Sequence, residues 1–239
     1  MRMFTDWVRL PTGWIRERGL CELRWGRGGD GSNFTAGLMA LAAIAHRAEQ
    51  QSGISHATYD QLCSATSLSR SKLSRGLDML CDFKVLQRAS DARSTYQLAG
   101  FYPQFGWGKV PAKSMYRGDQ IVAFSDFSLR RIPELDALKL FFLFIAFRDQ
   151  ATNRAHIGYE KIQEYTGVEG SRIKTGCSLL VTQSLIQVEY VPRPGNERGG
   201  ANAYRIVGID PYNHLGTRGR SATGGMPISS VGQNYTASP

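Results

Sequence analysis

Apolar residues recur every three or four positions in six stretches of the chain, which is the spacing of one face of an α-helix. Two of these stretches, 34–51 and 133–150, are long enough to predict a long helix each. The other four are shorter, and they predict two pairs of helices with a short turn inside each pair. The pairs cover 58–65 with 69–82, and 158–165 with 170–183.

Alternating apolar and polar residues predict two strands after each pair of helices. In the first half these strands are "VLQRA" and "TYQLA", on either side of residues 90–94. In the second half they are "LIQVEYV" and "AYRIVGI". The loop between the latter, "PRPGNERGGAN", is rich in Pro and Gly, so we expect it to project as a flexible wing. Beyond residue 210 the periodicity ends, which predicts a disordered tail.

The two halves of the chain match each other at a constant offset of 100 positions. Apolar residues fall on apolar residues and basic on basic, without a gap over about 80 positions, which is not easily produced by chance. The sequence therefore contains an internal repeat. The matched pairs include Tyr59 with Tyr159, Leu62 with Ile162, Thr66 with Thr166, Leu68 with Val168, Ser71 with Ser171, Lys72 with Arg172, Gly76 with Gly176 and Leu80 with Leu180.

A short lead-in segment precedes each repeat and belongs to it. "WVRLP" begins at Trp7 and "WGKVP" begins at Trp107, with basic Arg9 and Lys109 at their centres. Both segments are short and apolar enough to predict a strand. We expect two domains joined near 100–106. Their predicted bounds are 1–100 and 101–210, with the tail at 211–239.

Each repeat has the order helix, helix, turn, helix, strand, loop, strand, which resembles the winged helix-turn-helix family. The resemblance covers most of residues 1–210, and apolar residues such as Leu62, Leu68, Leu73 and Leu77 would define the packing of the three helices. It implies an α+β fold of two tandem winged helix-turn-helix domains related by internal duplication. The segment "WVRLP" also looks like the N-terminal extension of winged-helix domains in phage and plasmid replication proteins.

Basic residues exceed acidic ones throughout the chain. The formal net charge is +9 and the pI is near 9.6, although only 21 % of the residues are charged. Both halves are basic and neither contains a block of like charge, which favours a folded surface that meets an anion over a basic tail. A cationic protein whose charge serves only its solubility is the alternative.

In a helix-turn-helix, the second helix of the pair places its N-terminal residues against base edges in the major groove. Leu73, Gly76, Leu77 and Leu80 would form the inward face of this helix in the first repeat. The cations left outside could bind guanine or phosphate, and the hydroxyls suit phosphate or any base. The predicted DNA-binding residues are Ser69, which is also a good N-cap, Arg70, Ser71, Lys72, Ser74 and Arg75, and in the second repeat Ser171, Arg172, Lys174, Thr175 and Ser178.

Basic residues also occur in the two loops between strands. Arg88 and Arg93 belong to the tighter first loop, and Arg193 and Arg198 to the longer second loop. We expect them to enter a minor groove or to lie along phosphates, with an ordinary solvent-exposed loop as the alternative. Glu169 could cap its helix or accept a hydrogen bond from a cytosine amino group.

Motifs for catalysis, cofactors or metals are not evident. "GRGGDGSN" at 26–33 lacks the GK[ST] ending of a phosphate loop and is better interpreted as a turn. His46, His56, His156 and His214 have no zinc-ligand spacing, and the match of His56 with His156 indicates packing or capping. We expect no enzyme, no cofactor and no metal site.

The cysteines and the N-terminus indicate a cytoplasmic protein, which we expect to be nucleoid-associated because of its predicted DNA-binding residues. No CxxC pair occurs among the four cysteines, and the first residues lack the apolar core of a signal peptide. The sequons at Asn33 and Asn234 are therefore interpreted as chance matches. "ALKLFFLFIAF" at 137–147 is about half the length of a membrane span, so it predicts a buried core helix.

These features predict a sequence-specific protein that binds double-stranded DNA through both repeats, at a direct or imperfect repeat in the DNA. A transcriptional regulator and an origin-binding initiator of a plasmid or other mobile element both fit, and formation of a homodimer is left open. The alternative is an architectural subunit of a chromosome-organising complex. In that case residues 38–47 and exposed tryptophans (Trp7, Trp14, Trp25 and Trp107) would bind protein partners.

Overall fold

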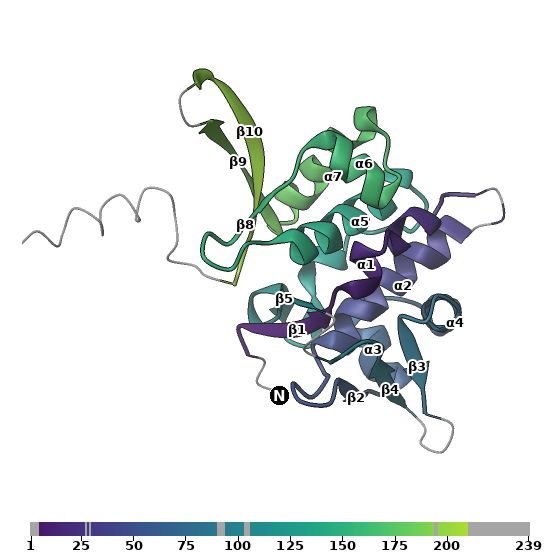
Figure 1. Cartoon of the computed structure of the whole chain (residues 1–239). Helices are drawn as coiled ribbons and strands as arrows, with labels where there is room; N and C mark the ends of the chain where they lie inside the picture. The colour runs from purple at the N-terminus through teal and green to yellow at the C-terminus, as the bar shows by residue number, and fades with distance from the viewer. Residues whose placement is uncertain are drawn as a thin grey trace, which may run out of the picture. The chain divides into compact units, whose positions relative to one another are not determined.

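The protein has an α+β fold, with seven α-helices and small antiparallel sheets in the part of the chain that the structure describes (Figure 1). This computed structural model describes residues 5–26, 28, 30–89, 94–102, 106–193 and 196–209, without the side chains of 192–200. One compact unit ends at Ile209. The tail predicted at 211–239 lies outside the described residues.

The first repeat contains a three-helix group and a three-stranded sheet, and the predicted helices are confirmed. The sheet has the order β2-β4-β3, so the strand between the long helix and the helix pair lies at one edge. The sequence pattern missed this strand because it has only three residues. In chain order the elements are α2 (Asp30–Ala45), β2 (Ile54–His56), α3 (Tyr59–Thr66), α4 (Arg70–Asp82), β3 (Leu86–Arg88) and β4 (Thr95–Leu98).

The second repeat has the same elements in the same order, and its sheet has the equivalent order β8-β10-β9. Its helix pair and first strand begin 100 positions after their counterparts. The last two strands are much longer than those of the first repeat and extend away from the helices (Figure 1). The elements are α5 (Ile132–Phe147), β8 (Arg154–His156), α6 (Tyr159–Thr166), α7 (Gly170–Thr182), β9 (Ile186–Arg193) and β10 (Asn196–Ile206).

Local sequence explains where the paired helices of the first repeat begin and end. Thr58 forms a capping box with Gln61 at the start of α3, and the Ser69 hydroxyl accepts a hydrogen bond from the backbone N–H of Lys72 at the start of α4. Ser67 ends α3 in the left-handed conformation, where the second repeat has Gly167. The turns are therefore of the same kind in both repeats.

The long helix and the second helix of the pair pack unusually close in the first repeat. Leu73, Gly76, Leu77 and Leu80 are buried, as their spacing predicts. A Cβ on Gly76 would lie only 2.7 Å from the backbone nitrogen of Gly37 on α2, so this crossing requires a residue without a side chain.

The lead-in segments of the two repeats form strands that pair with each other. β1 (Trp7–Pro11) and β5 (Trp107–Pro111) are antiparallel, and Arg9 lies opposite Lys109. The indoles of Trp7 and Trp107 are stacked, with ring centroids 5.9 Å apart. Each cation lies over the indole of the other strand, Arg9 over Trp107 and Lys109 over Trp7, which offsets the repulsion between like charges in a cross-strand pair.

The segment after β1 makes polar contacts with the second repeat. It contains α1 (Gly13–Arg16) and the 3-10 helix η1 (Gly19–Glu22). The guanidinium of Arg16 donates to the carbonyl of Ala146, the Cys21 thiol lies 3.1 Å from the carbonyl oxygen of Glu164, and Arg18 forms an ion pair with the Glu164 carboxylate.

The segment after β5 makes the reciprocal contact with the first repeat. Tyr116 Oη lies 3.2 Å from Nδ1 of His46 and accepts a hydrogen bond from Arg47, and Gln120 donates to the hydroxyl of Ser67. Both repeats are therefore completed by a segment that belongs, in sequence, to the other one. This segment contains η3 (Lys113–Met115), β6 (Tyr116–Arg117), β7 (Gln120–Ile121) and η4 (Val122–Phe124).

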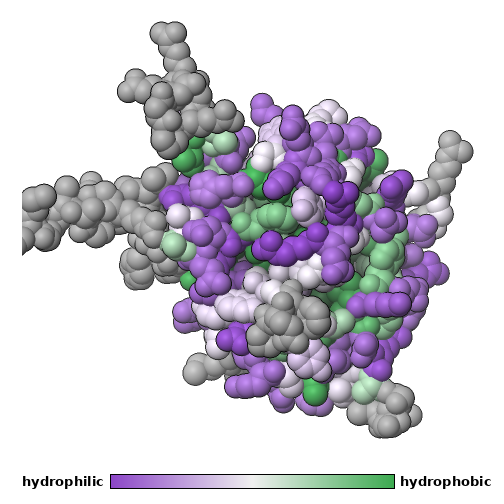
Figure 2. Space-filling view, viewed as in Figure 1, coloured by the Kyte–Doolittle hydropathy of each residue, from purple (hydrophilic) through white to green (hydrophobic). Residues whose placement is uncertain are grey.

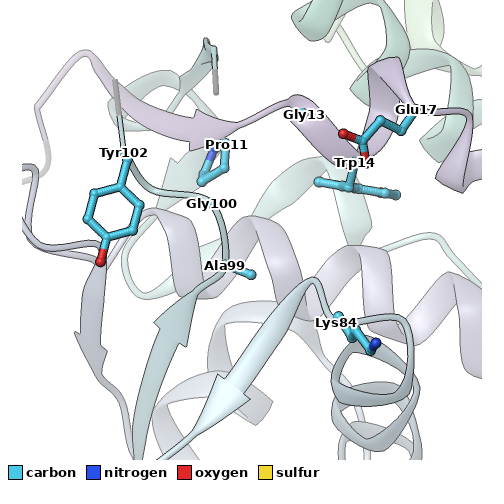
Figure 3. A pocket seen from close by; sticks show the side chains of 8 residues that line it. All are labelled: Pro11, Gly13, Trp14, Glu17, Lys84, Ala99, Gly100 and Tyr102. Atoms are coloured by element: carbon cyan, nitrogen blue, oxygen red, sulfur yellow. The ribbon is translucent and has the colours of Figure 1, made fainter. Parts of the chain in front are cut away.

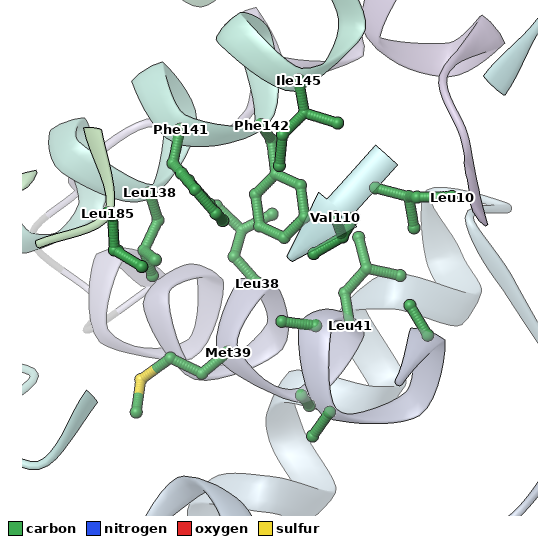
Figure 4. Close-up of a cluster of buried hydrophobic side chains, with 14 of the residues drawn as sticks. Leu10, Leu38, Met39, Leu41, Val110, Leu138, Phe141, Phe142, Ile145 and Leu185 are labelled. Carbon is green, nitrogen blue, oxygen red and sulfur yellow. The ribbon is translucent and has the colours of Figure 1, made fainter. Parts of the chain in front are cut away.

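A single hydrophobic core joins the two repeats. Figure 4 shows Leu38 and Leu41 of α2 pointing toward Phe142 of α5, with Val110 of β5 beside them. Most residues of both long helices are buried, which explains why the central parts of their sequences are apolar on all sides. On the face in Figure 2, hydrophilic side chains separate the exposed apolar residues into small groups.

Candidate nucleic-acid interface

The first turns of α4 present an exposed basic and hydroxyl-rich surface. Ser69, Arg70, Ser71 and Arg75 are exposed. The predicted residues Lys72 and Ser74 are only half exposed, because they border the buried face of the helix. The structure therefore places the six residues predicted for this helix at its N-terminal end, and four of them are exposed.

The cations of α4 differ in how firmly they are held. Arg70 forms an ion pair with Asp60 at 2.5 Å, but both side chains are largely exposed, so solvent screens this pair and it contributes little to stability. The ammonium of Lys72 donates to the amide oxygen of Asn33 at the start of α2. Arg75 has no ion-pair partner among the described residues.

The equivalent surface on α7 is also exposed, with one exception. Ser171, Lys174, Thr175 and Ser178 are open to solvent, and the Ser178 hydroxyl donates to the backbone carbonyl of Lys174. Arg172 is half exposed and lies 3.2 Å from the carboxylate of Asp136, whose side chain is only 4 % exposed. The Arg172 side chain is thus held against α5 rather than extended into solvent.

A buried charged cluster on α5 accompanies this ion pair. Burial raises the pKa of Asp136, and the neighbouring Arg172 and Lys139 act in the opposite direction. Burial also lowers the pKa of Lys139 to about 8, and its ammonium donates to the carbonyl of Leu23. Sequence reasoning missed this cluster, although charged residues inside an otherwise apolar helix were a visible signal.

Glu134 belongs to the same helix and is fully buried. Its carboxylate accepts hydrogen bonds from the backbone and hydroxyl of Ser128 and from the guanidinium of Arg131. These contacts anchor the start of α5.

Glu169 makes no capping hydrogen bond at the start of α7, so the predicted capping role is wrong.

Only one of the four predicted loop arginines is described with its side chain. Arg88 lies 2.9 Å from the carboxylate of Asp78 on α4, and both are partly exposed. Arg93 lies outside the described residues, and the side chains of Arg193 and Arg198 are not described. On β9, Val188 and Tyr190 are exposed.

The protein-binding surface considered in the sequence analysis is not formed. Residues 38–47 are buried in the core, and the four tryptophans Trp7, Trp14, Trp25 and Trp107 are half buried and pack against it. The expectation that these residues are exposed is wrong, because the long helix lies between the repeats instead of on the surface.

The described contacts of His46 and His56 are with residues of the fold itself. Burial lowers the pKa of His46 to about 3, and its Nε2 lies 2.9 Å from the carbonyl oxygen of Pro111. His56 is exposed and lies 3.0 Å from the hydroxyl of Thr95, so the predicted packing role is wrong for this residue. Within the described part of the chain, no group of three His, Cys, Asp or Glu side chains could hold a metal ion.

A cavity of about 320 Å³ lies where the end of β4 meets α1. Figure 3 shows Trp14 and Glu17 on one side of it, with Lys84 and Tyr102 on others. An equivalent cavity in the second repeat, of about 340 Å³, has Ser114, Arg117 and Ser184 at the positions of Trp14, Glu17 and Lys84. The two cavities share a place in the fold and differ in chemistry.

Among the described residues, no helix is both long and apolar enough to cross a membrane. Neither a scan against family models nor a search of curated proteins returned a match for this chain. The function of the exposed surfaces on α4 and α7 must therefore be argued from their geometry.

Proposed function

We propose that this protein is a sequence-specific, double-stranded DNA-binding protein built from two winged helix-turn-helix modules related by internal duplication. The observation that carries the proposal is the shared arrangement of three helices with a three-stranded sheet of order β2-β4-β3 and β8-β10-β9. In this arrangement α4 and α7 are the second helices of the pairs, which in helix-turn-helix proteins enter the major groove.

The side chains on these two helices support the proposal. Arg70 and Arg75 on α4 and Lys174 on α7 are exposed cations on the first turns, with exposed serines and threonines between them. Cations suit phosphate and guanine, and hydroxyls suit phosphate or any base. The net charge of +9 favours an anionic partner of the same kind.

The ion pairs seen at these helices are compatible with DNA binding. The pair of Arg70 with Asp60 is exposed, so exchanging it for a phosphate contact costs little free energy. The pair of Arg172 with Asp136 is half buried and would be costly to break. We therefore assign Lys174, rather than Arg172, as the principal cation of the second module.

The biological role that fits is control of transcription or binding to the replication origin of a plasmid or other mobile element. Two modules on one chain raise the effective concentration of the second module once the first is bound. A regulator and an initiator both require this kind of site-specific binding, and the choice between them depends on where the DNA site lies.

The proposal is tested by the affinity for random-sequence duplex DNA as a function of salt concentration. The double variant Arg70→Ala/Arg75→Ala should bind more weakly, and the slope of log K against log salt should become less steep by about two, since each lost phosphate contact removes about 0.9. The matched control is Lys113→Ala/Arg117→Ala, which removes two exposed cations outside α4 and α7. Equal affinities of the two variants, with both folded, would contradict the assignment of α4.

A further inference from the structure

The two repeats are related by an approximate two-fold rotation, and the pairing of β1 with β5 gives the first evidence for it. Arg9 lies opposite its own counterpart Lys109, Trp7 lies opposite Pro111, and Pro11 opposite Trp107. Exchanging each residue for its counterpart 100 positions away leaves this list of pairs unchanged. Only a two-fold axis through the centre of the ribbon produces such a self-complementary register.

The segments that cross between the repeats give independent evidence. Arg16 contacts Ala146, and its counterpart Tyr116 contacts His46, the counterpart of Ala146. These are the two halves of one self-complementary contact, formed by different chemistry. Two modules related by translation, in a head-to-tail arrangement, would instead make contacts between unlike surfaces.

Contacts at the helix-pair turns agree with the same axis. Gln120 of β7 donates to Ser67 at the end of α3. In the other direction, a Cβ on Gly167, the counterpart of Ser67, would lie 3.7 Å from the Cα of Cys21 in η1. The axis therefore relates α3 to α6, and with them α4 to α7.

We propose that one copy of the chain binds a single DNA duplex at two half-sites in inverted orientation, one read by α4 and the other by α7. The inference rests on the proposed function, and it replaces the direct or imperfect repeat that was expected from the sequence. A two-fold rotation reverses the direction in which the second helix meets the DNA, so equivalent residues read opposite strands. The chain is in this respect the single-chain equivalent of a symmetric homodimer.

The two half-sites are related but not identical, because the helices differ at the positions that face the DNA. Arg75 of α4 corresponds to Thr175 of α7, and Ser74 corresponds to Lys174. A guanine-binding guanidinium in one module therefore has no counterpart in the other, while the ammonium of Lys174 lies one position earlier. The expected site is an imperfect palindrome.

The experiment begins with selection of bound fragments from a random duplex pool at near-physiological salt. Duplexes are then made that hold the enriched half-sites in inverted order, in direct order at the same spacing, and with either half-site scrambled. The inverted duplex should bind at least about tenfold more tightly than the direct one, since only it engages both linked modules. Native mass spectrometry should find one chain on each inverted duplex.

The outcomes separate this inference from the proposed function. Equal or tighter binding of the direct duplex, or two chains on each inverted duplex, would overturn the inverted arrangement while DNA binding stands. An enriched motif with a single half-site would overturn it in the same way. If no motif is enriched, the proposed sequence-specific binding fails and the inference fails with it, whether or not the remaining binding depends on salt.

Two single variants assign the half-sites to their helices. Arg75→Ala should reduce protection of one half-site against chemical cleavage, and Lys174→Ala should reduce protection of the other. Both residues are exposed, so neither change should affect folding. Loss of protection at the same half-site in both variants would overturn the inference.

Discussion

The two repeats share one backbone arrangement but hold their second helices in different ways. In the first repeat α4 is fixed by backbone proximity, at the crossing of Gly76 with Gly37. In the second repeat α7 is fixed by side chains, with Arg172 paired to Asp136 beside Lys139. The counterparts of Asp136 and Lys139 in the first repeat are the apolar Ala36 and Met39. A repeated fold can therefore keep its geometry while one copy adds a buried charged cluster beside the helix crossing.

The largest expected effect is a loss of stability on substitution of the glycine at the helix crossing, which is Gly76 in the first repeat and Gly176 in the second. Gly76→Ala places a Cβ against the backbone of α2 and should lower the free energy of unfolding by about 3 kcal/mol. In Gly176→Ala the nearest atom, at 2.7 Å, is the flexible end of the Leu140 side chain, and the higher helix propensity of Ala offsets part of the strain, so the cost should stay below about 1 kcal/mol. Urea denaturation of both variants measures the difference, and equal losses would contradict it.

A second prediction concerns the replacement of Asp136 by alanine, the residue that the first repeat has at the equivalent position, Ala36. Asp136→Ala leaves Arg172 and Lys139 without their carboxylate and should lower the free energy of unfolding by about 2 kcal/mol. The matched change in the first repeat, Asn33→Ala, removes only the partner of the half-exposed Lys72 and should cost about 0.5 kcal/mol. Thermal denaturation at neutral pH ranks the two, and the reverse order would show that the cluster does not stabilise α7.

The third prediction concerns the pH dependence of the same cluster. The folded-state pKa of Lys139 is lowered to about 8, below its unfolded value, so its penalty is present at low pH and is relieved as pH rises from about 8 to 10.5. Lys139→Met copies the first repeat and should be more stable than the wild type at pH 7. This advantage should shrink by about 2 kcal/mol at pH 10, measured as the difference between the two free energies of unfolding from urea denaturation. A constant advantage would mean that Lys139 titrates normally.

The smallest effect concerns the helix starts. Ser69→Ala removes a capping hydrogen bond and should cost about 1 kcal/mol. Glu169→Ser supplies the missing cap at the same position of the second repeat and should gain about 0.5 kcal/mol. Chemical denaturation of this pair checks both signs. A loss in Glu169→Ser would show that the carboxylate stabilises the start of α7 through its charge alone.

Much of the local structure followed from the sequence because it depends on neighbouring residues. Spacing predicted the helices and the inward face of Leu73, Leu77 and Leu80, and Ser69 is the cap that its residue type suggested. The three-residue strands β2 and β8 were missed because so short a segment has no detectable alternation. Of the predicted contact surface, the exposure of Arg70, Arg75 and Lys174 agrees with their helical positions, whereas the partner of Arg172 could not be read from the sequence.

By itself, the sequence determined that two equivalent units follow one another at an offset of 100 positions, each with its helices and turns. The tertiary structure was needed to show that the units are related by an axis, that the segment after each lead-in strand contacts the other unit, and that the units share one core. The physical reason is that periodicity records which side of an element is buried, but not which partner buries it. Apolar long helices can pack on any apolar surface, so the two-fold arrangement is visible only in the self-complementary register of β1 with β5 and in the contacts between the repeats.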